Sequence, residues 1–172
     1  MSIELLQAHY GFARMPFGRD LAPNMLHRST GHNEAVARIN WCVQESALGV
    51  ITGEVGSGKT VATRAATSAL DQSRNTLIYL GNPAIGARGI YHGIVTALGG
   101  VPRFHKASLI PQTVDLLAAE ETERGKRVVV AIDEAHLLTP DQLEEIRLLT
   151  LGRADDYAER AILGACCAWS QP

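Results

Sequence analysis

The chain has 172 residues, of which 46% are hydrophobic and 20% are charged, and its formal net charge is −2. This composition is typical of one soluble globular domain, and it excludes fibrous, low-complexity and disulfide-rich classes. The near-neutral charge gives no overall nucleic-acid footprint, although it does not exclude DNA binding by a local patch. No apolar run approaches the length of a membrane span, so we expect no membrane partner.

The cysteines and the N-terminus predict a cytoplasmic location. Cys42, Cys166 and Cys167 form neither a disulfide framework nor a C-x-x-C site, which fits a reducing compartment. The first residues, Met1 to Glu4, lack the basic and apolar regions of a signal peptide.

Residues 1–30 are expected to form an N-terminal strap. Three aromatic residues and Pro16 lie between Tyr10 and Phe17, and Pro16 and Pro23 argue against a long helix. We predict that this segment packs over the core, and the alternative is that part of it borders an adenine ring.

The next stretch predicts a strand–loop–helix unit. Apolar residues at helical spacing indicate a helix over residues 31–47, and a short apolar strand, Leu48 to Ile51, follows it. Residues 53–60 then match G-x-x-x-x-G-K-[ST], the phosphate-binding P-loop. An alanine-rich helix over Val61 to Leu70 completes the context that this motif needs.

Each residue type in the loop has a physical role. Gly53, Gly56 and Gly58 are expected to adopt positive φ and let the backbone approach a phosphate. Lys59 would reach the β- and γ-phosphates of ATP, and the Thr60 hydroxyl would ligate Mg²⁺. The loop amides and the helix N-terminus would add positive potential. The predicted nucleotide-binding residues are Gly53, Glu54, Val55, Gly56, Ser57, Gly58, Lys59 and Thr60.

Residues 76–125 continue the alternation of strands and helices. We predict a strand over Thr76 to Leu80, a helix around residues 90–98, and a helix over Ser108 to Arg124 that ends at Gly125. A small basic cluster, Arg103, His105 and Lys106, precedes the last helix. We interpret this cluster as a solvated loop, and the alternative is a DNA contact.

An apolar strand and two carboxylates follow. Val128 to Ile132 is apolar without alternation, which predicts a strand buried on both faces of a parallel sheet. Asp133 and Glu134 lie at its C-terminal tip, where ligands bind in open α/β sheets. We predict that Asp133 is the Walker B acid and holds Mg²⁺ directly or through water. Glu134 would polarise the attacking water as general base.

A capping box begins the next helix. Thr139 suits the N-cap, Pro140 the first helical position and Gln142 the third, so we expect a helix from there to Gly152.

Together these motifs resemble AAA+ ATPases of the ExeA type, a group that includes transposition helpers related to TniB, IstB and MuB. The resemblance extends over residues 9–150 and includes Tyr10-Gly11-Phe12 and the run Asp133 to Leu138. It implies a three-layer α/β P-loop NTPase with a mostly parallel sheet, whose AAA+ core is residues 31–150. Arg88-Gly89-Ile90 looks most like the branch carried by mobile elements.

The resemblance also implies the activity. The expected reaction is hydrolysis of ATP with Mg²⁺, with Lys59 and Glu134 as catalytic residues and Thr60 and Asp133 at the metal. The implied role is a DNA transposition helper that recruits a transposase or integrase and works as a homo-oligomer. Hydrolysis in this class normally needs an Arg finger from a neighbouring subunit. Arg147 and Arg153 are surface candidates, and solvated helix-end charges are the simpler interpretation of both. His136 follows the family pattern, but its role is left open between structure and function.

Residues 151–172 depart from the family pattern. We expect that this segment is substituted or out of frame, that the chain is truncated, and that a C-terminal lid domain is absent. The family places a sensor strand between the two Walker strands, and Ala161 to Ala165 is apolar enough to fill that position. The sequence leaves open whether it does.

Three alternative functions remain at this point. The chain could be a nucleotide-binding remnant without turnover, or an ATPase of a type II secretion assembly system. A small-molecule kinase also fits the P-loop, but it needs an acceptor site that the sequence does not reveal.

Overall fold

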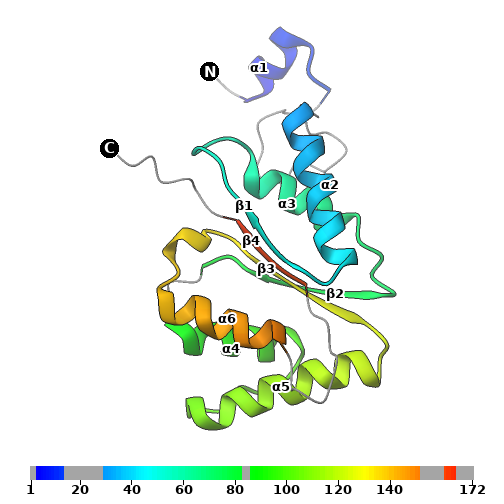
Figure 1. Cartoon of the computed structure of the whole chain (residues 1–172). Helices are drawn as coiled ribbons and strands as arrows, with labels where there is room; N and C mark the ends of the chain where they lie inside the picture. The colour runs from blue at the N-terminus through cyan, green and yellow to red at the C-terminus, as the bar shows by residue number, and fades with distance from the viewer. Residues whose placement is uncertain (1–2, 14–28, 83–85, 152–160, 166–172) are drawn as a thin grey trace.

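A computed structural model describes residues 3–13, 29–82, 86–151 and 161–165 (Figure 1). Within these residues, six α-helices and one 3-10 helix accompany four strands. The helices are α1 (Ile3–Tyr10), α2 (Thr30–Gln44), α3 (Lys59–Ser68), α4 (Gly86–Ala97), α5 (Lys106–Thr122), η3 (Ala135–Leu137) and α6 (Pro140–Leu151). The strands are β1 (Leu48–Ile51), β2 (Asn75–Leu80), β3 (Arg127–Ile132) and β4 (Ala161–Ala165).

The four strands form one parallel sheet in the order β1-β4-β3-β2. The last strand in the sequence, β4, therefore lies between the two strands that lead into the predicted site. Ile162 pairs with Leu48 on one side and with Val130 on the other. This placement answers the question that the sequence left open, because Ala161–Ala165 fills the central position. It supplies ladder partners to buried backbone groups whose loss would cost about 1–3 kcal/mol each.

Helices cover both faces of the sheet, which gives the expected three-layer α/β architecture (Figure 1). On one face, α2 and α3 pack through Ile39, Val43 and Ala66 onto Val129. On the other, α4, α5 and α6 pack onto alternate residues of the sheet, among them Val128 and Val130. Every residue of β3 after Arg127 is buried, as the apolar run predicted.

The predicted capping box at the start of α6 is present. The backbone N–H of Thr139 donates to the Gln142 side chain at 2.8 Å, and the Gln142 N–H donates to Thr139 Oγ1 at 3.3 Å. Within the same helical layer, the Glu145 carboxylate accepts hydrogen bonds from Tyr91 of α4 and Lys106 at the start of α5. These polar contacts join three helices, and they engage Lys106 of the predicted basic cluster.

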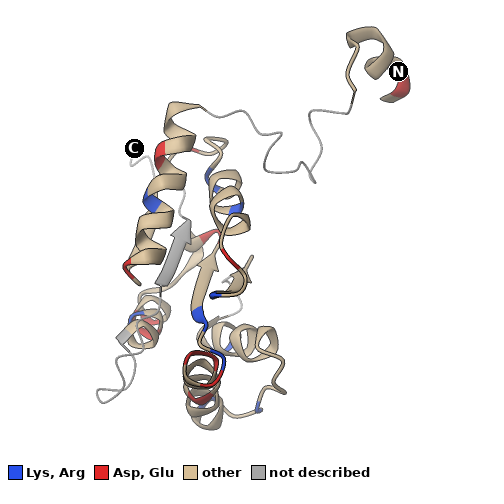
Figure 2. Ribbon diagram, turned by 90° about the vertical axis from the view of Figure 1, so that its right-hand side faces the viewer, with Lys and Arg blue, Asp and Glu red and all other residues tan. Residues whose placement is uncertain are grey.

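Only part of the predicted N-terminal strap lies within the described residues. Residues Ile3–Tyr10 form the short helix α1, none of whose residues is buried. Figure 2 shows α1 standing apart from the sheet and its covering helices. The ring of Tyr10, the last residue of α1, stacks on the ring of Phe12 with 5.5 Å between the ring centroids. Pro16 and Pro23, on which the prediction rested, lie outside the described residues.

Among the described residues, no helix combines the length and the apolar character that crossing a membrane requires.

Core packing on the α5 side leads to a first prediction. Leu117 is 1% exposed, and Leu117→Ala should lower the free energy of unfolding by about 2–5 kcal/mol because it removes buried methyl groups and leaves a cavity. Leu148→Ala is the matched control, since Leu148 is 51% exposed and should change stability by about 0.5 kcal/mol or less. Urea unfolding of both variants measures the difference. Equal losses would contradict this account of the core.

Candidate functional site

The loop between β1 and α3 has the backbone geometry of an anion-binding turn. Gly56 and Gly58 have φ of 81° and 85°, a left-handed region that side chains disfavour. Gly53 was predicted to share this conformation, and that prediction is wrong. A Cβ at Gly53 would lie 2.8 Å from Ser57 Oγ, so a larger residue there would require the serine hydroxyl to move.

The Lys59 ammonium lies across this loop. It donates hydrogen bonds to the carbonyl oxygens of Gly53 at 2.9 Å and Glu54 at 2.7 Å, and to Ser57 Oγ at 3.4 Å. Lys59 is also the first residue of α3, so the helix start and the loop fix its position together. The structure thus places a positive charge at the positive end of a helix dipole.

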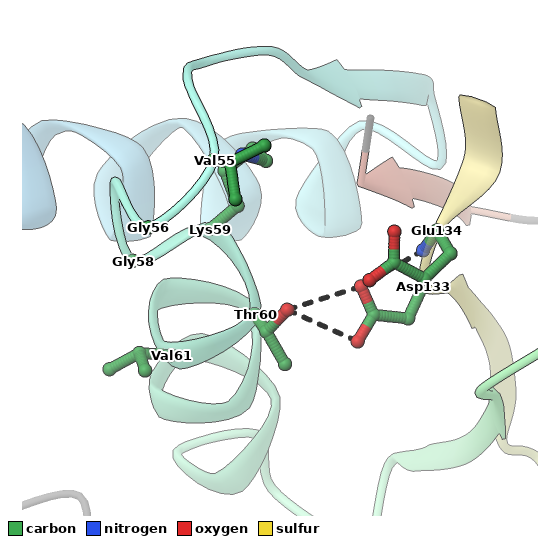
Figure 3. A pocket seen from close by; sticks show the side chains of 8 residues that line it. All are labelled: Val55, Gly56, Gly58, Lys59, Thr60, Val61, Asp133 and Glu134. Atoms are coloured by element: carbon green, nitrogen blue, oxygen red, sulfur yellow. Dashed lines mark hydrogen bonds between the residues drawn. The ribbon is translucent and has the colours of Figure 1, made fainter. Parts of the chain in front are cut away.

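Thr60 and Asp133 meet although 73 residues separate them in the sequence. The Thr60 hydroxyl lies 3.2 Å from each carboxylate oxygen of Asp133 (Figure 3). The backbone N–H of Glu134 donates to Asp133 Oδ1 at 3.0 Å, and the Tyr79 hydroxyl donates to Oδ2 at 2.5 Å. Three donors therefore fix the orientation of this carboxylate.

Glu134 has an unusual backbone conformation. Its φ of 52° is in the left-handed region, which costs a non-glycine residue about 1–3 kcal/mol, and residues held in such strained conformations cluster at functional sites. The Glu134 side chain is 49% exposed, and its Oε2 lies 3.3 Å from the buried Nδ1 of His136. The turn after β3 thus directs the Glu134 carboxylate to solvent beside Asp133 and places His136 next to it.

The P-loop and the turn after β3 line one pocket of about 300 Å³, a volume within the usual range of small-molecule sites. The lining residues are Val55, Gly56, Gly58, Lys59, Thr60, Val61, Asp133 and Glu134 (Figure 3). Gly53, Glu54 and Ser57 do not line it, and they contribute through their contacts with Lys59. The structure therefore brings both predicted segments, residues 53–60 and the pair Asp133 and Glu134, to one place.

Tyr79 is a neighbour of the site that sequence reasoning missed. Burial first, and then the hydrogen bond and negative charge of Asp133, raise the pKa of Tyr79 to about 12. A signal for Tyr79 existed in the sequence, because the predicted strand over Thr76 to Leu80 ends at the same sheet edge as Asp133.

The Arg finger candidates gain no support as site residues. Arg147 forms a bidentate ion pair with Glu144 on the exposed surface of α6, which agrees with the simpler interpretation of a solvated helix charge. Arg153 lies outside the described residues.

A parallel sheet with this strand order, and a glycine-rich loop between its first strand and the following helix, define a P-loop nucleotide-binding domain of the AAA+ class. The AAA domain family matches residues 43–162, and the chain belongs to this family.

A curated relative agrees with this assignment. The chain is 32% identical over 151 residues to General secretion pathway protein A of Aeromonas hydrophila, and the match covers 86% of this chain. It covers 27% of the relative, so the chain spans about a quarter of that protein's length. The predicted resemblance to AAA+ ATPases of the ExeA type is confirmed.

Solved structures share the fold. A Cdc6p structure from Pyrobaculum aerophilum superimposes with a TM-score of 0.65 at 19% identity, over 88% of this chain and 41% of that chain. The ORC2 protein of Aeropyrum pernix, solved as ADPNP and ADP complexes, superimposes with a TM-score of 0.63 at 22% identity. The match covers 90% of this chain and 44% of that chain. At these identities the likeness establishes the fold alone.

Gly58 gives a second prediction. Gly58→Ala should lower the free energy of unfolding by about 1–2 kcal/mol, since alanine disfavours the left-handed region. Gly31→Ala is the control, because Gly31 is an exposed residue of α2 with ordinary φ, and a Cβ added there would meet nothing within 4 Å. That change should be neutral or slightly stabilising. Chemical unfolding of both variants tests this, and equal stability of the two would contradict the loop geometry.

Proposed function

We propose that the chain binds ATP with Mg²⁺ and hydrolyses it to ADP and phosphate. The observation that carries this proposal is the meeting of Thr60 and Asp133, 3.2 Å apart, in the pocket that Lys59 and Glu134 also line. Family membership supports nucleotide binding, and turnover is the further step that we propose.

The residues around Asp133 fit a magnesium ion. Mg²⁺ prefers oxygen ligands. Proteins usually bind it with one or two carboxylates, and substrate phosphates and water supply the other ligands. The Thr60 hydroxyl and the Asp133 carboxylate supply such oxygens at one wall of the pocket. When bound, the ion would neutralise charge on the β- and γ-phosphates.

The remaining roles belong to groups of the chain itself. The loop amides and Lys59 would hold the phosphate oxygens, and Lys59 would exchange its contacts with the loop carbonyls for contacts with the nucleotide. Glu134 would accept a proton from the attacking water, for which its exposed carboxylate is accessible. An arginine from a second copy would stabilise the transition state, which requires a homo-oligomer.

For the cellular process, we propose a DNA transposition helper that recruits a transposase or integrase. The support is the sequence resemblance of Arg88-Gly89-Ile90 to the mobile-element branch. A second candidate is assembly of a type II secretion system, which the similarity to General secretion pathway protein A favours.

Binding is tested by thermal unfolding with and without ATP and Mg²⁺. At ATP concentrations a hundredfold above Kd, the wild-type chain should gain about 2.7 kcal/mol of stability. Lys59→Ala should abolish this gain because it removes the charge that holds the phosphates. Lys126→Ala, which removes the same charge just before β3, should keep it. A melt that is insensitive to ATP in the wild-type chain would reject nucleotide binding.

Turnover is tested with Glu134→Gln. This variant should bind ATP normally and lose phosphate release by about 10²- to 10⁴-fold, since general base catalysis contributes that much. Glu123→Gln, an exposed change at the end of α5, should release phosphate at the wild-type rate. ATP binding without phosphate release in the wild-type chain would instead support a nucleotide-binding protein without hydrolysis.

The process is tested by the fluorescence anisotropy of labelled duplex DNA. A transposition helper should bind DNA in an ATP-dependent manner, and the affinity should fall as salt rises because phosphate contacts release counterions. DNA binding that is absent with both ATP and ADP would favour the secretion candidate.

A further inference from the structure

We propose that Tyr79 is a positioning residue that sets how tightly Asp133 holds the Mg²⁺ of the bound nucleotide. This inference rests on the proposed function and adds a residue outside the P-loop and the Asp133–Glu134 pair. Its basis is the 2.5 Å hydrogen bond from the Tyr79 hydroxyl to Asp133 Oδ2.

The donors around Asp133 divide into two sets. Each carboxylate oxygen has about two lone pairs. The Glu134 N–H occupies one on Oδ1, and the Tyr79 hydroxyl occupies one on Oδ2. The Thr60 hydroxyl, which lines the pocket, is 3.2 Å from both oxygens and can donate its single proton to only one of them at a time. Tyr79 and the Glu134 N–H thus support the carboxylate from outside, and they leave its pocket side available to an ion.

The sheet fixes Tyr79 in place. In the ladder between β2 and β3, Tyr79 pairs with Ala131, and the Asp133 N–H donates to the Leu80 carbonyl at 2.9 Å. The backbones that carry the phenol and the carboxylate are therefore held in register. Tyr79 remains 43% exposed, so its hydroxyl is not a main source of core stability.

Loss of the Tyr79 hydroxyl should lower the affinity for Mg²⁺ and leave the stability of the fold nearly unchanged. Without it, one outer support remains, and the Asp133 side chain can rotate away from the pocket. Partners of this kind, hydrogen-bonded to metal ligands, typically change metal affinity by about 10- to 100-fold when they are removed.

The experiment is a calorimetric titration of ATP into the full chain at a series of Mg²⁺ concentrations and in EDTA. Tyr79→Phe removes only the hydroxyl, and it should raise the Mg²⁺ concentration for half-maximal enhancement of ATP affinity by about tenfold or more. Its ATP affinity in EDTA should equal that of the wild-type chain. Tyr91→Phe is the matched control, because it removes a phenol hydroxyl that bonds to Glu145 in the helical layer away from the pocket. It should leave the Mg²⁺ dependence unchanged.

Three results would overturn the inference. The first is an equal Mg²⁺ requirement in Tyr79→Phe and the wild-type chain. The second is an equal loss of ATP affinity with and without Mg²⁺, which would place Tyr79 at the nucleotide or the loop and not behind the metal ligand. The third is a wild-type chain that binds ATP without responding to Mg²⁺, which would leave nucleotide binding intact. A wild-type chain that binds no ATP at all would reject the proposed function itself.

Discussion

The site depends on the parallel pairing of β4 with both β1 and β3. The P-loop follows β1 and the carboxylates follow β3, and these two strands are not neighbours. Their ends can meet only if the strand between them holds both in register. Gly164 pairs with Val50 on one side and with Ile132 on the other, so one strand near the end of the sequence sets the spacing between Thr60 and Asp133. The short strand Ala161–Ala165 thus joins the two halves of the pocket.

The polar contacts around Asp133 orient its carboxylate. Thr60 comes from the P-loop helix, Tyr79 from β2, and the Glu134 N–H from the turn after β3. Each donor is carried by a different element, so the orientation of the carboxylate depends on the relative positions of all three. The left-handed backbone of Glu134 belongs to the same arrangement, because the turn that brings its N–H to Asp133 also directs its side chain to solvent. In sites of this kind, the groups that hydrogen-bond to a metal-ligating side chain matter as much for its orientation as the side chain itself.

Fold and function are separate conclusions for this chain. Membership of the AAA domain family accounts for the sheet order, the loop and nucleotide binding as a class property. Hydrolysis, the process it serves and the partner subunit depend on groups that the family alone does not specify. The charges on the surface of α6 illustrate this, because the exposed ion pair of Arg147 with Glu144 assigns the arginine no role at a site.

The sequence by itself determined the local elements and the residue types of the site. The P-loop spacing, the apolar run of β3 and the Thr139–Gln142 capping box each express a short-range rule, and all three are present in the structure. The positive φ predicted at Gly53 is not found, because the loop has its left-handed residues at Gly56 and Gly58. Only the tertiary structure decided that Ala161–Ala165 enters the centre of the sheet, that α1 buries none of its residues, and that Tyr79 reaches Asp133. The position of Ala161–Ala165 and the contact of Tyr79 follow from strand order and register, which join residues far apart in the chain and leave no periodic signal in the sequence.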